Sequence, residues 1–207
     1  MRPYTRFIVA IMALLLAGCV STGPVTSRSL PMPTVTTARM FNPASYPTIG
    51  VYIEDLSGGR LQPGTIRLIE DAFMRQILAN GYALAARSDI EKVIREQRLQ
   101  ASGVTEETIA RVGRVLNVPA IILVSINSLT SERTRPPSIY DPKMQYYQLG
   151  VTMSARLIAA ERAEVLWLSS YGEDWKAASQ RGHPQDQWPR VLQHVADVVA
   201  RGLPPRR

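Results

Sequence analysis

Cys19 is the only cysteine of the 207-residue chain, and it offers a thiol that can be alkylated. It follows Leu16-Ala17-Gly18, whose last two residues are small enough to admit a peptidase beside the thiol. An unpaired thiol is a liability in an oxidising compartment, where cysteines normally form disulfides. Covalent modification of Cys19 would explain both its position and the lack of a second cysteine.

The residues before Cys19 have the pattern of a secretory signal. Arg2 and Arg6 supply a positive start, and residues 7–16 form an apolar run. A positive start, an apolar middle and small residues before a cut are the parts of a signal peptide. The run is too short to span a bilayer, which takes about 20 residues. We expect residues 1–18 to be removed by cleavage between Gly18 and Cys19.

The stretch Leu16-Ala17-Gly18-Cys19 resembles the lipobox of bacterial lipoproteins. In that class a diacylglyceryl group is added to the cysteine sulfur, and cleavage leaves an acylated cysteine as the first residue. The resemblance implies palmitate-type chains on Cys19 and attachment to membrane lipid, which is stable with two or more chains. In Gram-negative sorting, Val20 in place of Asp favours the outer membrane, with the domain facing the periplasm. The alternative is an ordinary signal peptide with an incidental cysteine.

Few other residues are placed for chemistry. His183 and His194 lack the carboxylate cluster or the spacing of a metal site, so we expect no metal and no cofactor. Asp55, Ser57 and His183 could be imagined as a hydrolase set, but Asp55 and Ser57 fit a polar turn better, because both residue types bond their own backbone there. Glu96 fits the end of a helix better than a catalytic role. No P-loop or GxSxG motif occurs, and we expect no enzyme.

Aromatic residues in the C-terminal half are the candidate partner contacts. Trp167, Tyr171 and Trp175 recur at offsets of four, which places them on one face of an expected strand. Core packing is the simpler interpretation, and an exposed platform for a partner protein is the alternative. Three tyrosines flank a proline-containing loop over 131–144, where they could form a rim contact or pack within the loop. The candidate partner-binding residues are Tyr140, Tyr146, Tyr147 and Trp175.

The charge balance is modestly basic. The full chain carries a formal net charge of +7, and loss of Arg2 and Arg6 with the signal leaves 22 basic and 17 acidic residues, or +5. A solvated surface explains this balance, and attraction to an anionic glycan, lipid headgroup or acidic partner is the alternative. No basic stripe interleaved with aromatics appears, so we expect no nucleic-acid partner.

The mature chain divides into a tether and a domain. Residues 19–47 are rich in Ser, Thr and Pro, and such a segment buries too little apolar surface to offset its ordering entropy. We expect a flexible tether there; a meandering strand laid over the domain through Met40 and Phe41 is the alternative. Residues 48–204 have the composition of one ordinary domain that is stable without disulfides.

Hydrophobic periodicity predicts an α/β fold for this domain. The run 120–126 is almost wholly apolar, which suits a central strand covered on both faces. Helix–strand alternation followed by a hairpin at 161–163 implies a mixed β-sheet with helices packed on it and a C-terminal helix. The expected strands are 48–53, 82–86, 120–126, 147–159 and 164–175. The expected helices are 63–79, 106–116 and 186–203. A further helix is expected to begin with a capping box at 88–91 and to end at the break at 102–103.

The order and spacing of these stretches resemble the CsgG-like family, which includes the curli secretion lipoprotein and the LpoB-type activators of penicillin-binding proteins. The resemblance covers about residues 48–172 and implies an outer-membrane lipoprotein with an α/β sandwich like the N-terminal domain of TolB. The matching stretches are Ile49-Gly50-Val51, 78–82, 86–97, 102–104, 109–116, 118–125 and the hairpin 151–169.

Two departures from that family bear on function. Its channel-forming members insert two amphipathic hairpins, whose strands should alternate for about 10 residues. Here 131–144 carries charges and prolines, 174–187 is short and polar, and Val118-Pro119 stands where Gly-Ala is usual. We therefore expect a non-enzymatic protein-interaction or regulatory module in envelope biogenesis, whose envelope partner the sequence does not name. The alternatives are a homo-oligomeric subunit of a CsgG-type secretion channel and an envelope hydrolase.

Overall fold

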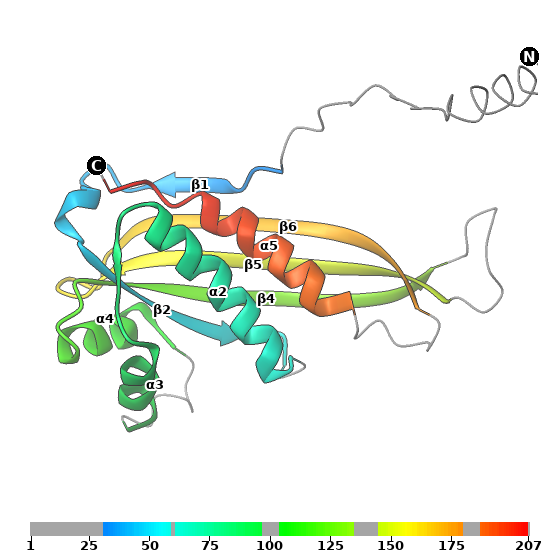
Figure 1. Cartoon of the computed structure of the whole chain (residues 1–207), viewed down its shortest axis with the longest axis horizontal. Helices are drawn as coiled ribbons and strands as arrows, with labels where there is room; N and C mark the ends of the chain where they lie inside the picture. Colours follow the sequence, from blue (N-terminus) through cyan, green and yellow to red (C-terminus); the bar gives the residue numbers. More distant parts are fainter. Residues whose placement is uncertain (1–30, 59–60, 97–103, 135–144, 180–186, 207) are drawn as a thin grey trace, which may run out of the picture. The chain divides into compact units, whose positions relative to one another are not determined.

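Six strands form the sheet: β1 (Thr34–Thr37), β2 (Thr48–Asp55), β3 (Ala83–Leu84), β4 (Ala120–Thr134), β5 (Gln145–Ala159) and β6 (Val165–Ser179). Their order across the sheet is β1-β6-β5-β4-β2-β3 (Figure 1). β2 pairs in parallel with β3 and β4, whereas the pairs β4–β5, β5–β6 and β1–β6 are antiparallel. The computed structural model describes residues 31–58, 61–96, 104–134, 145–179 and 187–206, which belong to one compact unit, Pro31–Arg207.

Helices cover both faces of the sheet. The helices are α2 (Pro63–Ala79), α3 (Arg87–Glu96), α4 (Glu106–Val115) and α5 (Trp188–Arg201). Alternate residues of a strand point to opposite faces. Ile122 and Val124 of β4 therefore pack in the core under α2 and α5, while Ile121 and Leu123 pack in a second core under α3 and α4. Figure 1 shows α2 and α5 side by side across the sheet, with α3 and α4 apart from them.

The C-terminal helix is fastened to the sheet through its last turn. The indole N–H of Trp167 on β6 donates to the carbonyl of Gly202 at 2.8 Å, and the Ser169 hydroxyl donates to the carbonyl of Val199 at 2.9 Å. Both side chains are buried, so each bond satisfies polar groups that water does not reach. Among the described residues, no helix is both long and apolar enough to cross a bilayer.

The predicted fold class is confirmed: a mixed sheet carries packed helices, including the C-terminal one. The helix predicted over 63–79 has those limits, because its apolar stripe is unbroken and Pro63 stands in the first turn. The predicted strand 82–86 is shorter, with only Ala83–Leu84 paired. The prediction of a capping box at 88–91 is wrong, because α3 already begins at Arg87. The Glu91 carboxylate instead accepts a hydrogen bond from Arg87 Nε at 2.6 Å.

The predicted tether differs from the structure in its C-terminal part. β1 lies inside it and pairs with β6 along its four residues, from Thr34 opposite Ser170 to Thr37 opposite Trp167. The β-branched residues of β1 favour extended backbone, and an open edge of β6 is available to them. Phe41 packs against the core with its ring centroid 5.8 Å from that of Tyr46, so the alternative of a strand over the domain describes residues 34–46 better.

Candidate functional site

Three strands continue well beyond the rest of the sheet. β4, β5 and β6 each have fifteen residues and pair out to Thr134 opposite Tyr146 and Gln145 opposite Ser179, whereas β2 accompanies β4 only as far as Ile126. Figure 1 shows these strands extending past α3 and α4. We refer to residues 127–134, 145–154 and 170–179 as the ribbon.

One face of the ribbon is packed under α5 and holds two of the predicted aromatic residues. Leu149 and Val151 are buried there, and Tyr147 is only 8% exposed, with its hydroxyl donating to Gln145 Oε1 at 2.8 Å. Trp175 lies opposite Leu149 and is half-buried, with its ring centroid 5.5 Å from that of His194 on α5. Tyr147 and Trp175 therefore share this face and contribute to its packing.

His194 also lies on this packed side. Its Nε2 lies 3.2 Å from Glu173 Oε2 on β6, and its side chain is 35% exposed. The helix turns this position toward β6, where Trp175 and Glu173 contact it. Burial raises the pKa of the neighbouring Tyr171 hydroxyl, and the Glu173 carboxylate raises it further.

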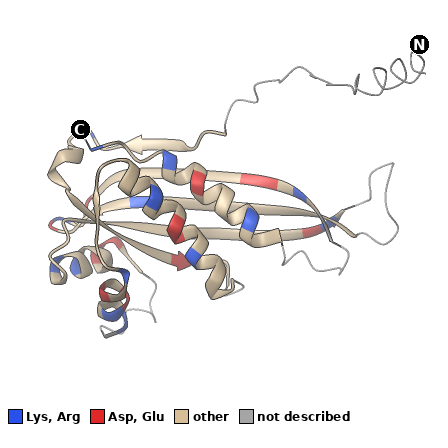
Figure 2. Cartoon of the chain, in the orientation of Figure 1, with Lys and Arg blue, Asp and Glu red and all other residues tan. Residues whose placement is uncertain are grey.

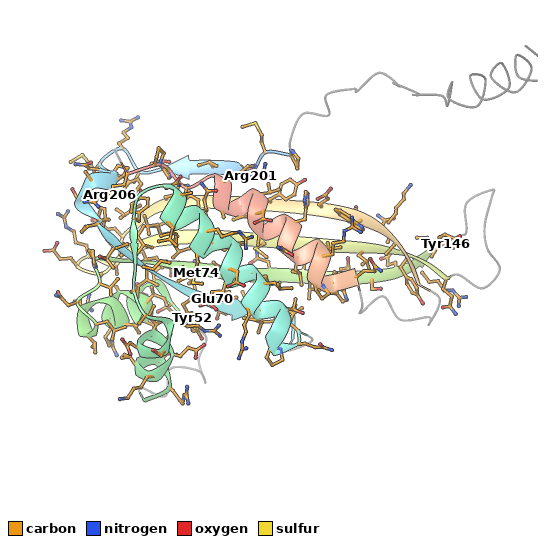
Figure 3. The ribbon with its side chains drawn as sticks, viewed as in Figure 1. Tyr52, Glu70, Met74, Tyr146, Arg201 and Arg206 are labelled. Carbon is orange, nitrogen blue, oxygen red and sulfur yellow. The ribbon has the colours of Figure 1, made fainter. Side chains whose placement is uncertain are left out.

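The opposite face of the ribbon is polar, and none of the helices in the part of the chain that the structure describes covers it; we name it the outer face. The strand register arranges it in rows across the three strands. These rows are Ser128-Thr152-Gly172, Thr130-Gly150-Asp174, Glu132-Gln148-Lys176 and Thr134-Tyr146. Tyr146 lies at the far end of the ribbon (Figure 3), and the strand register places it on the outer face, whereas Tyr147 and Trp175 lie on the packed face.

Hydrogen bonds between strands hold the outer-face side chains in place. The hydroxyls of Ser128 and Thr152 are 2.6 Å apart, and the Gln148 amide donates to Asp174 Oδ2 at 3.1 Å. A Cβ atom on Gly150 would lie 2.4 Å from Thr130 Oγ1, so a larger residue there would require the Thr130 side chain to move. Gly150 and Gly172 leave a shallow hollow of about 380 Å³ between the polar side chains.

A change of residue type along the strands explains why α3 and α4 stop short of the ribbon. On this face Ile121 and Ile158 lie in the second core, where helices bury them. The next rows carry Arg156, whose guanidinium pairs with Glu106 of α4, and then Ser154, which bonds Asn127 at 3.1 Å. Polar side chains offer a helix no apolar surface to bury, so the outer face stays open.

Of the remaining candidate residues, the structure describes the surroundings of Asp55 and Ser57. The Ser57 backbone N–H and hydroxyl both donate to Asp55 Oδ1, the former at 2.9 Å, which confirms the predicted polar turn. Glu96 is the last residue of α3. Within the described ranges, no three His, Cys, Asp or Glu side chains converge as metal ligands would. Gly18, Cys19, Tyr140 and His183 lie outside the described residues.

The sequence prediction missed one buried ion pair. Glu70 on α2, labelled in Figure 3, is 5% exposed. Its carboxylate pairs with Arg87, whose Nε also bonds Glu91. Burial raises the pKa of the Glu70 carboxyl, and the Arg87 guanidinium opposes that rise. The signal was present in the sequence, because Glu70 stands between Ile66 and Phe73 on the apolar stripe of its helix. This pair joins α2 to α3 beside β2.

Comparisons with known proteins give matches in structure alone. No protein-family model matches the chain, and no curated protein matches it. The PelC dodecamer from Paraburkholderia phytofirmans is 14% identical with a TM-score of 0.44, over 85% of this chain and 100% of that one. Lipoprotein GNA1162 from Neisseria meningitidis is 13% identical with a TM-score of 0.44, over 74% of this chain and 97% of that one.

The C-terminal domain of LpoB from Salmonella enterica is also similar. It is 12% identical with a TM-score of 0.38, over 69% of this chain and 87% of that one. A solved LpoB domain is thus among the similar structures, and the CsgG-like assignment stays a prediction. With TM-scores below 0.5, these similarities carry no argument about function, and the proposal below depends on the residues of this chain.

Proposed function

We propose that the chain is a periplasmic lipoprotein, anchored to the outer membrane by acylated Cys19, that serves envelope biogenesis as a non-enzymatic interaction module. In this proposal a partner protein docks on the outer face of the ribbon. The observation that carries it is the outer face, over which the described residues place no helix, although α3 and α4 cover the same side of β4 where β2 pairs with it.

The chemistry of the outer face suits a folded protein with a polar surface. It offers hydroxyls at Ser128, Thr130 and Thr152, an amide at Gln148 and charges of both signs at Asp174 and Lys176. Figure 2 shows Lys and Arg interspersed with Asp and Glu over the helices and strands, so no single sign of charge dominates. Specific interfaces are made of such mixed hydrogen-bonding groups around a few anchors, and Tyr146 is the aromatic anchor available here.

Rigidity supports the same proposal. The outer-face groups lie on paired strands and bond one another across them, so a partner would meet side chains that are already ordered. Ordered side chains lose less entropy on binding than mobile ones do. A regulatory module that works by docking benefits from side chains that are ordered before the partner binds.

Photo-crosslinking in intact cells tests the proposal. A photoreactive amino acid is placed at Thr152 or Tyr146 on the ribbon, and at Arg67, which is exposed on α2, as the control. We expect a heavier adduct from positions 152 and 146 and none from 67, with the captured protein identified by mass spectrometry. Adducts at all three positions, adducts at none, or an adduct of twice the chain mass would each contradict a specific partner at this face.

A further inference from the structure

We infer that the free edge of β1 rests on the lipid leaflet that carries the Cys19 anchor. The inference depends on the anchoring part of the proposed function, and it adds a second, non-covalent contact with the membrane. That contact would set which part of the domain faces the lipid and which part faces the periplasm.

Exposed apolar side chains gather at this edge. Met40 is 93% exposed, Met32 82% and Val35 43%, and Val165 at the start of β6 is 39% exposed. Within the described residues only three other large apolar side chains are comparably exposed: Leu56, Leu78 and Val115. Scattered exposed apolar residues are ordinary, but several on one edge mark a surface that meets another apolar phase.

Backbone pairing places these four residues along one edge of the sheet, with Val35 on the face that α5 covers and Val165, opposite Ile158, on the other face. Met32 lies just before β1, and Val35 lies on β1 opposite Ser169 of β6. The Ala38 N–H donates to the carbonyl of Leu166 at 2.9 Å, next to Val165. The Phe41 N–H then closes a turn onto the Ala38 carbonyl at 3.0 Å, which leaves Met40 at the tip of the turn.

The edge itself is open. β1 is the last strand of the sheet among the described residues, no described strand pairs with its outer side, and all four of its residues are exposed (Figure 1). Met40 borders a hollow lined by Arg114, Glu161, Arg162 and Glu164, whose charges cancel. We therefore expect contact through apolar insertion and not through attraction to anionic headgroups.

The length of chain before β1 makes the lipid leaflet the occupant to expect. Twelve residues lead from Cys19 to Pro31, and a chain of that length spans at most about 40 Å when fully extended. A short connection keeps the edge at a high effective concentration beside its own anchor, on the order of millimolar. Apolar contacts that would be too weak from bulk solution are then populated.

Lipid-borne quenching tests the inference on the full acylated chain. Acylation leaves no free thiol, so Met40→Cys gives a single site for a fluorophore, and Leu56→Cys gives a control at another exposed apolar position. The variants are placed in vesicles of phosphatidylethanolamine and phosphatidylglycerol that contain nitroxide-labelled lipid. We expect quenching at 40 to exceed that at 56 several-fold, to persist without phosphatidylglycerol, and to fall when Met32 and Val35 are changed to Ser.

The possible outcomes distinguish failure of the inference from failure of the proposed function. Equal quenching at 40 and 56, in chains whose intact mass shows the acyl groups and which float with the vesicles, would overturn the edge contact alone. A chain without acyl groups would remove the anchor and the inference together. A fluorescence change that follows protein density at constant lipid would show that β1 meets a second copy, which would also overturn it.

Discussion

Gly113 shows how a single residue limits the packing of two elements. It lies in the last turn of α4 and is buried against Ala160 in the turn between β5 and β6. A Cβ atom there would lie 2.6 Å from the Cβ of Ala160 and 3.0 Å from the Val118 carbonyl oxygen. The helix therefore accepts the conformational cost of a glycine in exchange for close contact with the sheet.

We predict that Gly113→Ala lowers the free energy of unfolding by about 1–3 kcal/mol, because the backbone must move to relieve the overlap. Gly64→Ala is the matched control: Gly64 is in the first turn of α2 and a Cβ there would meet nothing within 4 Å. Urea denaturation measures both. Equal stability of the two variants would contradict the packing described for α4.

Glu70 gives a prediction in pH. Burial raises its pKa above the ordinary value of 4.5, so the folded chain holds the proton at a higher pH than the unfolded chain does. Stability contributed by Glu70 is therefore complete below pH 4.5 and is lost as pH rises through the raised pKa. Glu70→Gln removes this dependence while keeping an oxygen acceptor for Arg87.

We expect acidification from pH 7 to about pH 5 to move the difference in unfolding free energy between wild type and Glu70→Gln in favour of the wild type. Urea denaturation at both pH values measures that difference, and NMR titration of the Glu70 carboxyl supplies its pKa directly. A movement in the opposite direction would mean that Arg87 outweighs burial.

At the scale of elements, hydrophobic periodicity predicted the limits of helices and strands that bury an apolar face. It did not predict the segments whose side chains are polar or exposed. The stripe of α2 gave its limits because Ile69, Phe73 and Ile77 all enter the core. Residues 131–134 were predicted as part of a loop, yet they extend β4, since their polar side chains belong to a ribbon with an open face. β1 has four residues, and all of them are exposed, so it shows no hydrophobic periodicity. Its extended structure depends on pairing with β6.

The open ribbon gives a prediction for one of its exposed positions. Thr152→Arg puts a long charged side chain over the hollow at Gly172, where a docked partner would meet it. Because Thr152 is exposed, we expect the unfolding free energy to stay within about 0.5 kcal/mol of wild type. Capture of the partner from Tyr146 should fall by about tenfold, which corresponds to about 1.4 kcal/mol of binding free energy.

Crosslinking yield from position 146 measures that loss, and Arg67→Glu on α2 is the control, since it changes charge on the helical side of the sheet. Undiminished capture by the Thr152→Arg variant would place the partner elsewhere on the domain. Reduced capture by both variants would indicate a general charge effect and not a site.

At the scale of the molecule, the sequence was sufficient for the fold class but not for the site. Buried strands and helical stripes are local patterns, and they predicted a mixed sheet with a C-terminal helix. The outer face is formed by polar residues of three strands that the pairing register brings side by side. The sequence of one strand does not show how it pairs with the others. Tyr146 and Tyr147 are adjacent in sequence and lie on opposite faces for the same reason.

The account as a whole depends on acylation of Cys19, because both the docking role and the membrane contact of β1 require an anchored chain. Intact mass spectrometry of the protein extracted from bacterial membranes tests this most directly. We predict a mature chain that begins at Cys19 and carries the added mass of a diacylglyceryl group and its acyl chains. A chain that begins at another residue, or at Cys19 without acyl mass, would contradict the account.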